Sequence, residues 1–124
     1  MKSAPYCYAA CRVDRVVDGD TVDLWINLGF STFVKKRVRL QGIDAPESRT
    51  RDLDEKKRGL AAKARLIEML HADQTGETAL CDLESHEIGK YGRVLGTLWI
   101  GDLNINRQML VEGFAKECAV VTHH

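Results

Sequence analysis

The 124-residue chain contains little proline, few aromatic residues and no long apolar run. It has 2 Pro and 10 Gly, aromatic residues make up 6% of the chain, and hydrophobic residues make up 44%. This balance excludes collagen-like, low-complexity and disordered classes, because such chains lack the apolar residues of a packed core. No stretch approaches the roughly 20 apolar residues of a membrane span, so we expect no membrane partner. The length and composition predict a single domain with one core.

The chain also lacks a net charge, since 18 Lys and Arg balance 18 Asp and Glu. Indiscriminate attraction of the whole molecule to nucleic acid is therefore excluded, and any polyanion site must be local. Residues 35–51 contain six basic and two acidic residues, whereas residues 73–87 contain five acidic residues and no Lys or Arg. The first segment suits an anion, and a merely solvated surface is the alternative interpretation.

Cysteine is sparse, with four residues at positions 7, 11, 81 and 118. This uneven spacing does not suit a disulfide-rich secreted scaffold, so buried free thiols are the favoured interpretation. Zinc bound by Cys7 and Cys11 with His86 or His71 is the alternative, although structural zinc usually needs a second close pair of ligands. The first residues contain no apolar run typical of a signal peptide, which favours a cytoplasmic location; a secreted protein trimmed of its leader would look the same.

Alternation of apolar and polar residues predicts β-strands in the N-terminal third of the chain. We expect strands at residues 12–17, 22–28 and 33–40, with a tight turn at Asp18-Gly19-Asp20. Asp20 has the parity of the apolar face, where a carboxylate requires a bound cation or another partner. In the third strand a basic stripe is formed by Lys35, Arg37 and Arg39.

The rest of the chain predicts two helices and two further strands. We expect helices at residues 55–71 and 104–112 and strands at residues 77–83 and 93–100. The first helix is expected to bury an apolar stripe of Leu60, Ala64, Ile67 and Leu70. The second is expected to turn inward Ile105, Met109 and Leu110. This order of elements favours the α+β class, with a five-stranded OB-type barrel and two or three packed helices, over a doubly wound parallel sheet.

Three short segments contain residues suited to phosphodiester chemistry. Asp20, Asp44 and Glu47 offer the hard oxygen atoms that calcium or magnesium prefers. Arg39 and Arg93 offer planar guanidinium groups that match phosphate oxygens at two points. Each segment alone is typical of an ordinary turn or surface loop. Together, three carboxylates and two arginines are what metal-assisted phosphodiester cleavage requires.

These segments resemble the staphylococcal nuclease (thermonuclease-like) family. The shared motifs are VDGDTV at 17–22, VRLQGIDAPE at 38–47 and KYGR at 90–93, in the family's order and with similar spacing. The resemblance implies an OB-fold barrel and a calcium-dependent nuclease, with magnesium or manganese as the alternative metal. It also implies cleavage of DNA and RNA, a preference for single-stranded or open substrate, and products that end in 3′-phosphate.

The resemblance further implies a role for each matching residue. Asp20 and Asp44 would be carboxylate ligands of one metal ion, and the main-chain carbonyl of Ala45, where family members often have Thr, would be a third ligand. Asp18 would support these ligands without binding the metal itself.

The remaining roles concern the water and the substrate. Glu47 would orient or deprotonate the attacking water. Arg39 and Arg93 would hold the phosphate and stabilise the negative charge of the transition state. Lys90 and Tyr91 would contact the terminal phosphate of the bound nucleotide.

The C-terminal part departs from the family pattern. Residues 118–121 contain no aromatic ring where the family packs rings against a base, so we expect weaker nucleotide affinity or a different base preference. The family's third helix is also expected to be shortened or absent. We assign residues 1–11 to an N-terminal extension, 12–117 to the nuclease-like domain and 118–124 to a tail.

Two other functions remain as alternatives. The first is a catalytically silent OB-fold module that binds nucleic acid or protein, against which the joint presence of the candidate carboxylates and arginines argues. The second is a structural domain with a merely solvated charged loop, which leaves Asp20 on an apolar face unexplained. We therefore expect a monomeric nuclease whose partner is nucleic acid.

Overall fold

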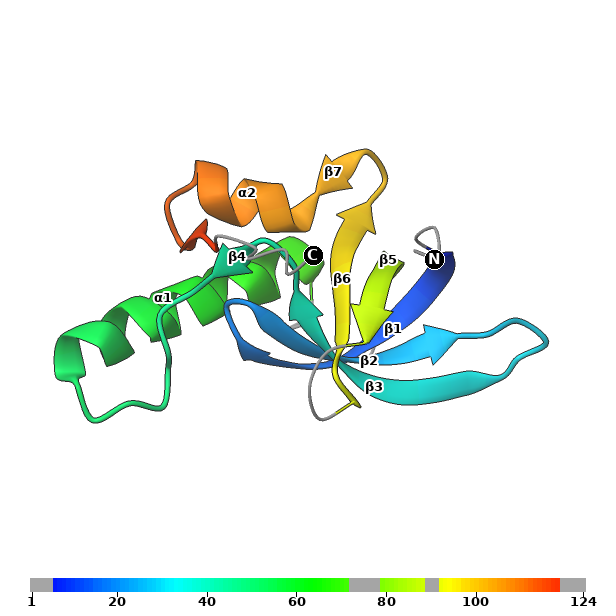
Figure 1. Cartoon of the computed structure of the whole chain (residues 1–124), viewed down its shortest axis with the longest axis horizontal. Coiled ribbons are helices and arrows are strands. Elements are labelled where there is room, and N and C mark those ends of the chain that lie inside the picture. Colours follow the sequence, from blue (N-terminus) through cyan, green and yellow to red (C-terminus); the bar gives the residue numbers. More distant parts are fainter. Residues whose placement is uncertain (1–5, 72–78, 89–91, 119–124) are drawn as a thin grey trace, which may run out of the picture.

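The computed structural model describes residues 6–71, 79–88 and 92–118, which form a β-barrel with two helices packed against it (Figure 1). The strands of the barrel are β1 (Tyr6–Asp18), β2 (Thr21–Asn27), β3 (Phe33–Leu40), β5 (Leu80–Ile88) and β6 (Val94–Ile100). Neighbours in the order β3-β2-β1-β5-β6 are antiparallel, and a parallel pairing of β3 with β6 closes the barrel. The predicted α+β class and five-stranded OB-type barrel are confirmed.

Helices and short strands lie at one end of this barrel (Figure 1). They are β4 (Ile43–Asp44), α1 (Leu53–Leu70), β7 (Leu103–Asn104), α2 (Ile105–Val111) and β8 (Lys116–Glu117). The described residues contain no third helix. None of the helices in the described ranges is long and apolar enough to cross a membrane.

Strand β1 is longer than predicted because it pairs with two partners. Its C-terminal half joins β2 through a tight turn at Gly19 and Asp20, as the Asp-Gly signal predicted. Its N-terminal half, from Tyr6, pairs with β5, with a register shift between Tyr8 and Cys11. Residues 6–11, which the sequence assigned to an extension, are therefore strand residues.

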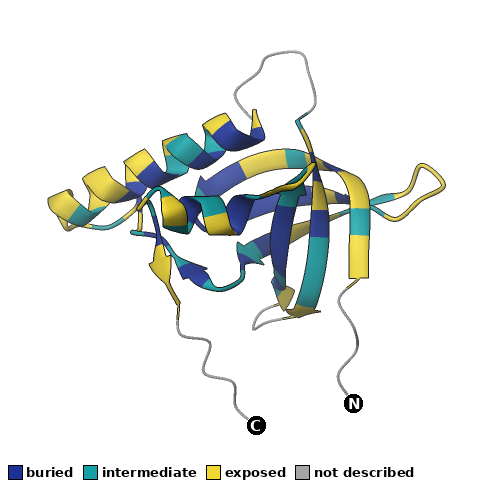
Figure 2. Ribbon diagram, turned by 90° about the horizontal axis from the view of Figure 1, so that it is seen from above, coloured by how far each residue is buried: buried dark blue, intermediate teal, exposed yellow. Residues whose placement is uncertain are grey.

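The barrel interior contains the apolar face of β2, as predicted. Val22, Leu24 and Ile26 are 0%, 0% and 4% exposed. Leu28, which was expected to continue this face, lies beyond the end of β2 and is 49% exposed. The β2–β3 hairpin extends away from the helices, and its tip is exposed (Figure 2).

The cysteines differ in exposure. Cys11 and Cys81 are buried register partners on β1 and β5, and burial raises the pKa of the Cys11 thiol and raises that of Cys81 to about 12. Both thiols are therefore protonated and unreactive at neutral pH. Cys7 and Cys118 are exposed, so the expectation of buried thiols is wrong for these two.

Helix α1 begins earlier than predicted and buries a face that only partly matches the predicted stripe. Asp52 caps it, because the Asp52 carboxylate accepts hydrogen bonds from the N–H groups of Asp54 (3.0 Å) and Glu55 (3.2 Å). The predicted stripe is wrong at Leu60, which is 48% exposed, and at the exposed Ala64, whereas Leu70 is buried and Ile67 is partly buried, as predicted. The residues that α1 buries are Gly59, Ala62, Leu66, Met69 and Leu70. Two of these are small, which lets the helix backbone approach the barrel closely.

Helix α2 is fixed to the barrel by a buried amide. The Asn106 side-chain nitrogen donates to the carbonyls of Gln41 and Gly96, both at 3.0 Å, and its oxygen accepts from the Leu98 N–H at 3.2 Å. A buried amide satisfied in this way favours one packing arrangement over its alternatives. Ile105 and Met109 are fully buried beside it, as predicted, and Leu110 is partly buried.

An ion pair between the two helices predicts a pH-dependent stability. Arg65 Nε lies 2.6 Å from Glu112 Oε1, and Arg65 Nη2 lies 2.9 Å from Oε2. Arg65, with a smaller effect of Gln108, lowers the pKa of Glu112 from 4.5 to about 2. Because the folded pKa is lower than the unfolded one, the stabilisation is fully present above pH 4.5 and is lost as the pH falls toward 2. We expect the Tm advantage of the wild type over Glu112→Gln to shrink between about pH 6 and about pH 3 in circular-dichroism melts. An advantage that stays constant over this range would contradict the role of the pair.

Candidate active site

Asp20 connects the β1–β2 turn to the segment after β4. Its side chain is buried, with Oδ1 accepting from the Thr21 hydroxyl (2.9 Å) and Oδ2 from the Ala45 N–H (2.8 Å). The expectation that a carboxylate on this apolar face has partners is confirmed. The bond to Ala45 also brings the first two sequence motifs together.

Arg39, on β3, lies between the two candidate metal ligands. Its Nη1 donates to the carbonyls of Leu40 (3.0 Å) and Ile43 (2.9 Å). Its Nη2 lies 3.3 Å from Asp44 Oδ1 and 3.5 Å from Asp20 Oδ2. The carbonyl contacts fix the plane of the guanidinium group, and the two carboxylates converge on a single nitrogen atom. The structure thus brings together three of the residues singled out from the sequence.

The oxygen atoms of Asp20 and Asp44 form a donor set that fits calcium. An ionised carboxylate keeps free lone pairs beside its existing hydrogen bonds, and calcium accepts mixtures of carboxylate, carbonyl and water oxygens. Within residues 6–71, 79–88 and 92–118, no group of three or more His, Cys, Asp or Glu side chains is arranged to hold a metal ion. A main-chain carbonyl, for which Ala45 is the predicted donor, and water would therefore complete the coordination shell.

Glu47 lies on the loop between β4 and α1, and other residues hold this loop in place. The Glu47 side chain is exposed, and its N–H donates to Glu55 Oε2 at 3.2 Å. Ser48 is buried, and both its N–H and its hydroxyl donate to Asp18 Oδ1. Asp18 thus anchors the Glu47 loop to the β1–β2 turn, a contact that the sequence did not reveal. No described hydrogen bond or ion pair joins the Glu47 carboxylate to Asp20, Arg39 or Asp44.

Gly59 on α1 is the second support of this loop. A Cβ atom at this position would overlap the Glu47 carbonyl and would lie 2.7 Å from the Ser48 nitrogen. The helix and the Glu47 loop therefore touch backbone to backbone, which only glycine permits here.

We expect Gly59→Ala to lower both stability and turnover. Helix propensity alone predicts that the free energy of unfolding rises by about 0.5–1 kcal/mol. The overlap with the loop predicts that it falls by about 1–3 kcal/mol. The sequence predicts that Glu47 orients the attacking water, and a displacement of about 1 Å near a reacting centre can cost 10²-fold, so we expect kcat to fall about 10-fold or more. Denaturant unfolding and nuclease assays measure the two effects. In the control, Ala64→Gly at an exposed helix position, stability should fall without a change in kcat; a stabilised and fully active Gly59→Ala would contradict the prediction.

The pairing of β6 with β3 sets the position of Arg93. This residue directly precedes β6, whose parallel register with β3 pairs Val94 with Val38, so Arg93 lies next to Arg37. Among the described residues, its buried Nε has no hydrogen-bond partner, and no ion pair or hydrogen bond joins Arg93 to the Asp20–Arg39–Asp44 cluster. A buried guanidinium donor without a partner is available to an anionic ligand. Lys90 and Tyr91 lie outside the described residues.

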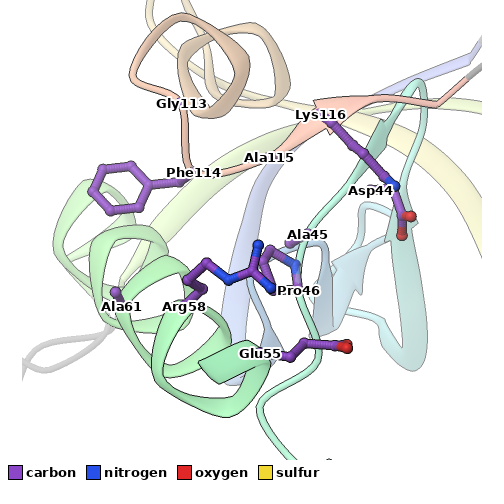
Figure 3. A pocket seen from close by; sticks show the side chains of 10 residues that line it. All are labelled: Asp44, Ala45, Pro46, Glu55, Arg58, Ala61, Gly113, Phe114, Ala115 and Lys116. Atoms are coloured by element: carbon purple, nitrogen blue, oxygen red, sulfur yellow. The ribbon is translucent and has the colours of Figure 1, made fainter. Parts of the chain in front are cut away.

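Two hollows contain candidate site residues, one of them Arg93 and the other Asp44. An open groove of about 640 Å³ is lined by Lys35, Lys36, Arg37, Gly92 and Arg93. A second cleft of about 520 Å³ opens beside Asp44, between α1 and the segment that follows α2 (Figure 3).

The second cleft contains residues that no sequence motif identified. Lys116 is the register partner of Asp44 in the β4–β8 ladder, and its side chain extends toward the Asp44 carboxylate (Figure 3). Arg58 and Glu55 project from α1, and Phe114 lies at the far side of the cleft (Figure 3). The cleft has the size of small-molecule sites in general, which is enough for a nucleotide.

The closed barrel defines an OB-type domain, and this domain carries a cluster of two carboxylates and one arginine. Residues 37–124 match the family model described as staphylococcal nuclease homologue. The chain therefore belongs to the staphylococcal nuclease homologue family.

Individual relatives agree with this assignment. The chain is 31% identical over 104 residues to the thermonuclease of Staphylococcus intermedius, covering 84% of this chain and 56% of the relative. It is 34% identical over 113 residues to the micrococcal nuclease of Shigella flexneri, covering 84% and 55%. It is 29% identical over 113 residues to protein ParB of Escherichia coli, covering 84% and 54%. The chain thus spans about half the length of the curated relatives it matches.

Proposed function

We propose that the protein is a calcium-dependent nuclease that hydrolyses phosphodiester bonds of DNA and RNA, prefers single-stranded or open substrate and leaves 3′-phosphate ends. The observation that carries this proposal is the convergence of Asp20 and Asp44 on the fixed guanidinium group of Arg39. Family membership and the names of two relatives, a thermonuclease and a micrococcal nuclease, support it.

The residues of the chain have complementary tasks in this reaction. Asp20, Asp44 and the Ala45 carbonyl would hold one calcium ion, which supplies positive charge beside the phosphate and lowers the cost of the transition state. Arg93 holds the phosphate oxygens through its rigid N–H fork, and Arg39 holds them through N–H groups other than those that bond to the Leu40 and Ile43 carbonyls. Lys90 and Tyr91 contact the terminal phosphate of the bound nucleotide.

Glu47 orients the attacking water and accepts its proton. The water oxygen forms a bond to phosphorus, and the bond between phosphorus and the 5′ oxygen breaks. The 5′ oxygen leaves and takes up a proton from solvent, so the phosphate remains esterified to the 3′ oxygen. The contacts of Asp18 with Ser48 and of Gly59 with the Glu47 backbone keep the loop in place for this step.

The test is cleavage of denatured DNA and of RNA at mildly alkaline pH with calcium, magnesium, manganese or a chelator. We expect cleavage with calcium, none with chelator, and 3′-phosphate ends on labelled fragments. Asp44→Asn should weaken calcium binding in calorimetry, whereas the matched variant Asp102→Asn, in the exposed turn before β7, should bind calcium as the wild type does. A folded protein that cleaves nothing with any metal would overturn the proposal and favour a silent nucleic-acid or protein binding module.

A further inference from the structure

The outer face of β1, β2 and β3 carries aromatic rings and cations that the proposed reaction does not use. Trp25 on β2 has Arg12 and Lys35 as its two cross-strand register partners. Lys35 Nζ lies 5.7 Å from the centre of the Trp25 ring, and the Arg12 guanidinium carbon lies 4.6 Å from the centre of the Phe33 ring. Trp25 is 39% exposed, and both cations are exposed. Rings and cations are thus presented to solvent side by side.

This face leads directly to the candidate active site. Alternate residues of a strand share one face, so Phe33, Lys35, Arg37 and Arg39 form a row along β3 that ends at the Asp20–Arg39–Asp44 cluster. At about 3.3 Å per residue the row is about 20 Å long. The groove that contains Arg93 is lined by Lys35 and Arg37 of this row and by Lys36 between them. In Figure 1 the β2–β3 hairpin reaches away from the helices, so the row extends from the cluster to open solvent.

The face remains basic after its ion pairs are counted. Asp14 contacts Lys35 Nζ (3.0 Å) and accepts from the Trp25 indole N–H (3.2 Å). Asp23 lies beneath the row, 7% exposed, and is paired with Arg37 at 2.9 Å. Against these two carboxylates stand four cations of the same face, Arg12, Arg15, Lys35 and Arg37.

We propose that this face is a binding track for single-stranded nucleic acid, which guides the strand along β3 to Arg39 and Arg93. A base stacks on Trp25, and the phosphates lie against Arg12, Lys35 and the groove. Cations track a nucleic-acid backbone, and an aromatic ring stacks on any base, so binding tolerates many sequences. The inference rests on the proposed function for the direction of the track, whereas binding itself requires no turnover.

Trp25 provides a direct spectroscopic test, because the chain contains only 2 Trp. In Trp99→Phe, Trp25 is the single tryptophan. We expect its fluorescence to be quenched by an octathymidylate and much less by a dithymidylate, in chelator to prevent metal-dependent cleavage. In the matched variant Trp25→Phe, which retains Trp99 on β6, the same octamer should cause little change. Quenching of Trp99 alone, or of neither residue, would overturn the track.

Affinity and kinetics give the second test. Trp25→Ala should weaken octamer binding roughly 5- to 150-fold, the range found for one base–aromatic stack. Lys35→Gln should weaken it and reduce the slope of log affinity against log salt by about 0.7, whereas Lys57→Gln on α1 should change neither.

With calcium, the track variants should lose kcat/KM on the octamer and keep it on the dinucleotide. Failure of the wild type to cleave either substrate would refute the proposed nuclease and leave the binding test standing. Unchanged octamer binding in both Trp25→Ala and Lys35→Gln would refute the track while leaving the nuclease intact, and would favour a protein partner for this face.

Discussion

Glu47→Gln is expected to lower kcat by about 10²- to 10⁴-fold while calcium binding and Tm stay close to those of the wild type. Glutamine keeps the size of glutamate but does not accept a proton from water. The Glu47 side chain is exposed, and the loop is held by main-chain contacts and by Ser48, so the substitution removes little packing. The rate should therefore fall without loss of structure.

Turnover of denatured DNA, calorimetric calcium binding and thermal melts measured side by side test this expectation. Glu87→Gln, a matched change at an exposed position of β5, should keep the wild-type rate. If Glu47→Gln also kept that rate, Glu47 would have no part in proton transfer. A large loss of calcium binding would instead place the Glu47 carboxylate among the metal ligands.

The barrel was predictable from local sequence patterns, whereas parts of its strand pairing were not. The alternation of Val22, Leu24 and Ile26 and the Asp-Gly turn are local signals, and the structure follows both. Residues 6–11 do not alternate between apolar and polar residues, and most of them are exposed in the structure. They form a strand because their main chain pairs with β5. That pairing joins segments far apart in the chain, so no short window of sequence contains it.

The buried face of α1 is a second feature that the sequence did not fully predict. Leu60 fits an apolar stripe, but the helix turns Gly59 and Ala62 toward the barrel and leaves Leu60 half exposed. The structure places small residues at this interface because the Glu47 loop and the β1–β2 turn lie close to the helix backbone, as the contacts of Gly59 and Gly19 show. Hydrophobicity alone does not reveal where a backbone must approach closely.

The candidate site also contains residues that the sequence predicted and contacts that it did not. The motifs predicted Asp20, Arg39, Asp44, Glu47 and Arg93 as one group because their residue types and order carry the chemistry. Described ion pairs join only Asp20, Arg39 and Asp44. The bond between Asp18 and Ser48 spans 30 residues and involves common turn-forming residues, so no pattern marked it in advance. The residues that position Glu47 were therefore found only in the structure.

Arg39→Lys is expected to lower kcat by about 10²- to 10³-fold, the cost of removing one preorganised donor at a developing negative charge. Lysine has a single compact ammonium group, which does not contact the Leu40 and Ile43 carbonyls and both carboxylates at once. Asp20 is 7% exposed and would lose its contact with the guanidinium group. We therefore also expect a loss of about 1–3 kcal/mol in the free energy of unfolding.

The two effects of Arg39→Lys can be separated by their sizes. Domains of this kind have unfolding free energies of about 5–15 kcal/mol, so a loss of 1–3 kcal/mol leaves most molecules folded. A 10²-fold fall in dinucleotide turnover would then report lost phosphate stabilisation and not an unfolded population. Arg107→Lys, at an exposed position of α2, should change neither quantity. If Arg39→Lys kept the wild-type turnover, with or without lowered stability, the guanidinium group would not act on the substrate. Arg39 would then serve only as a structural link between Asp20 and Asp44.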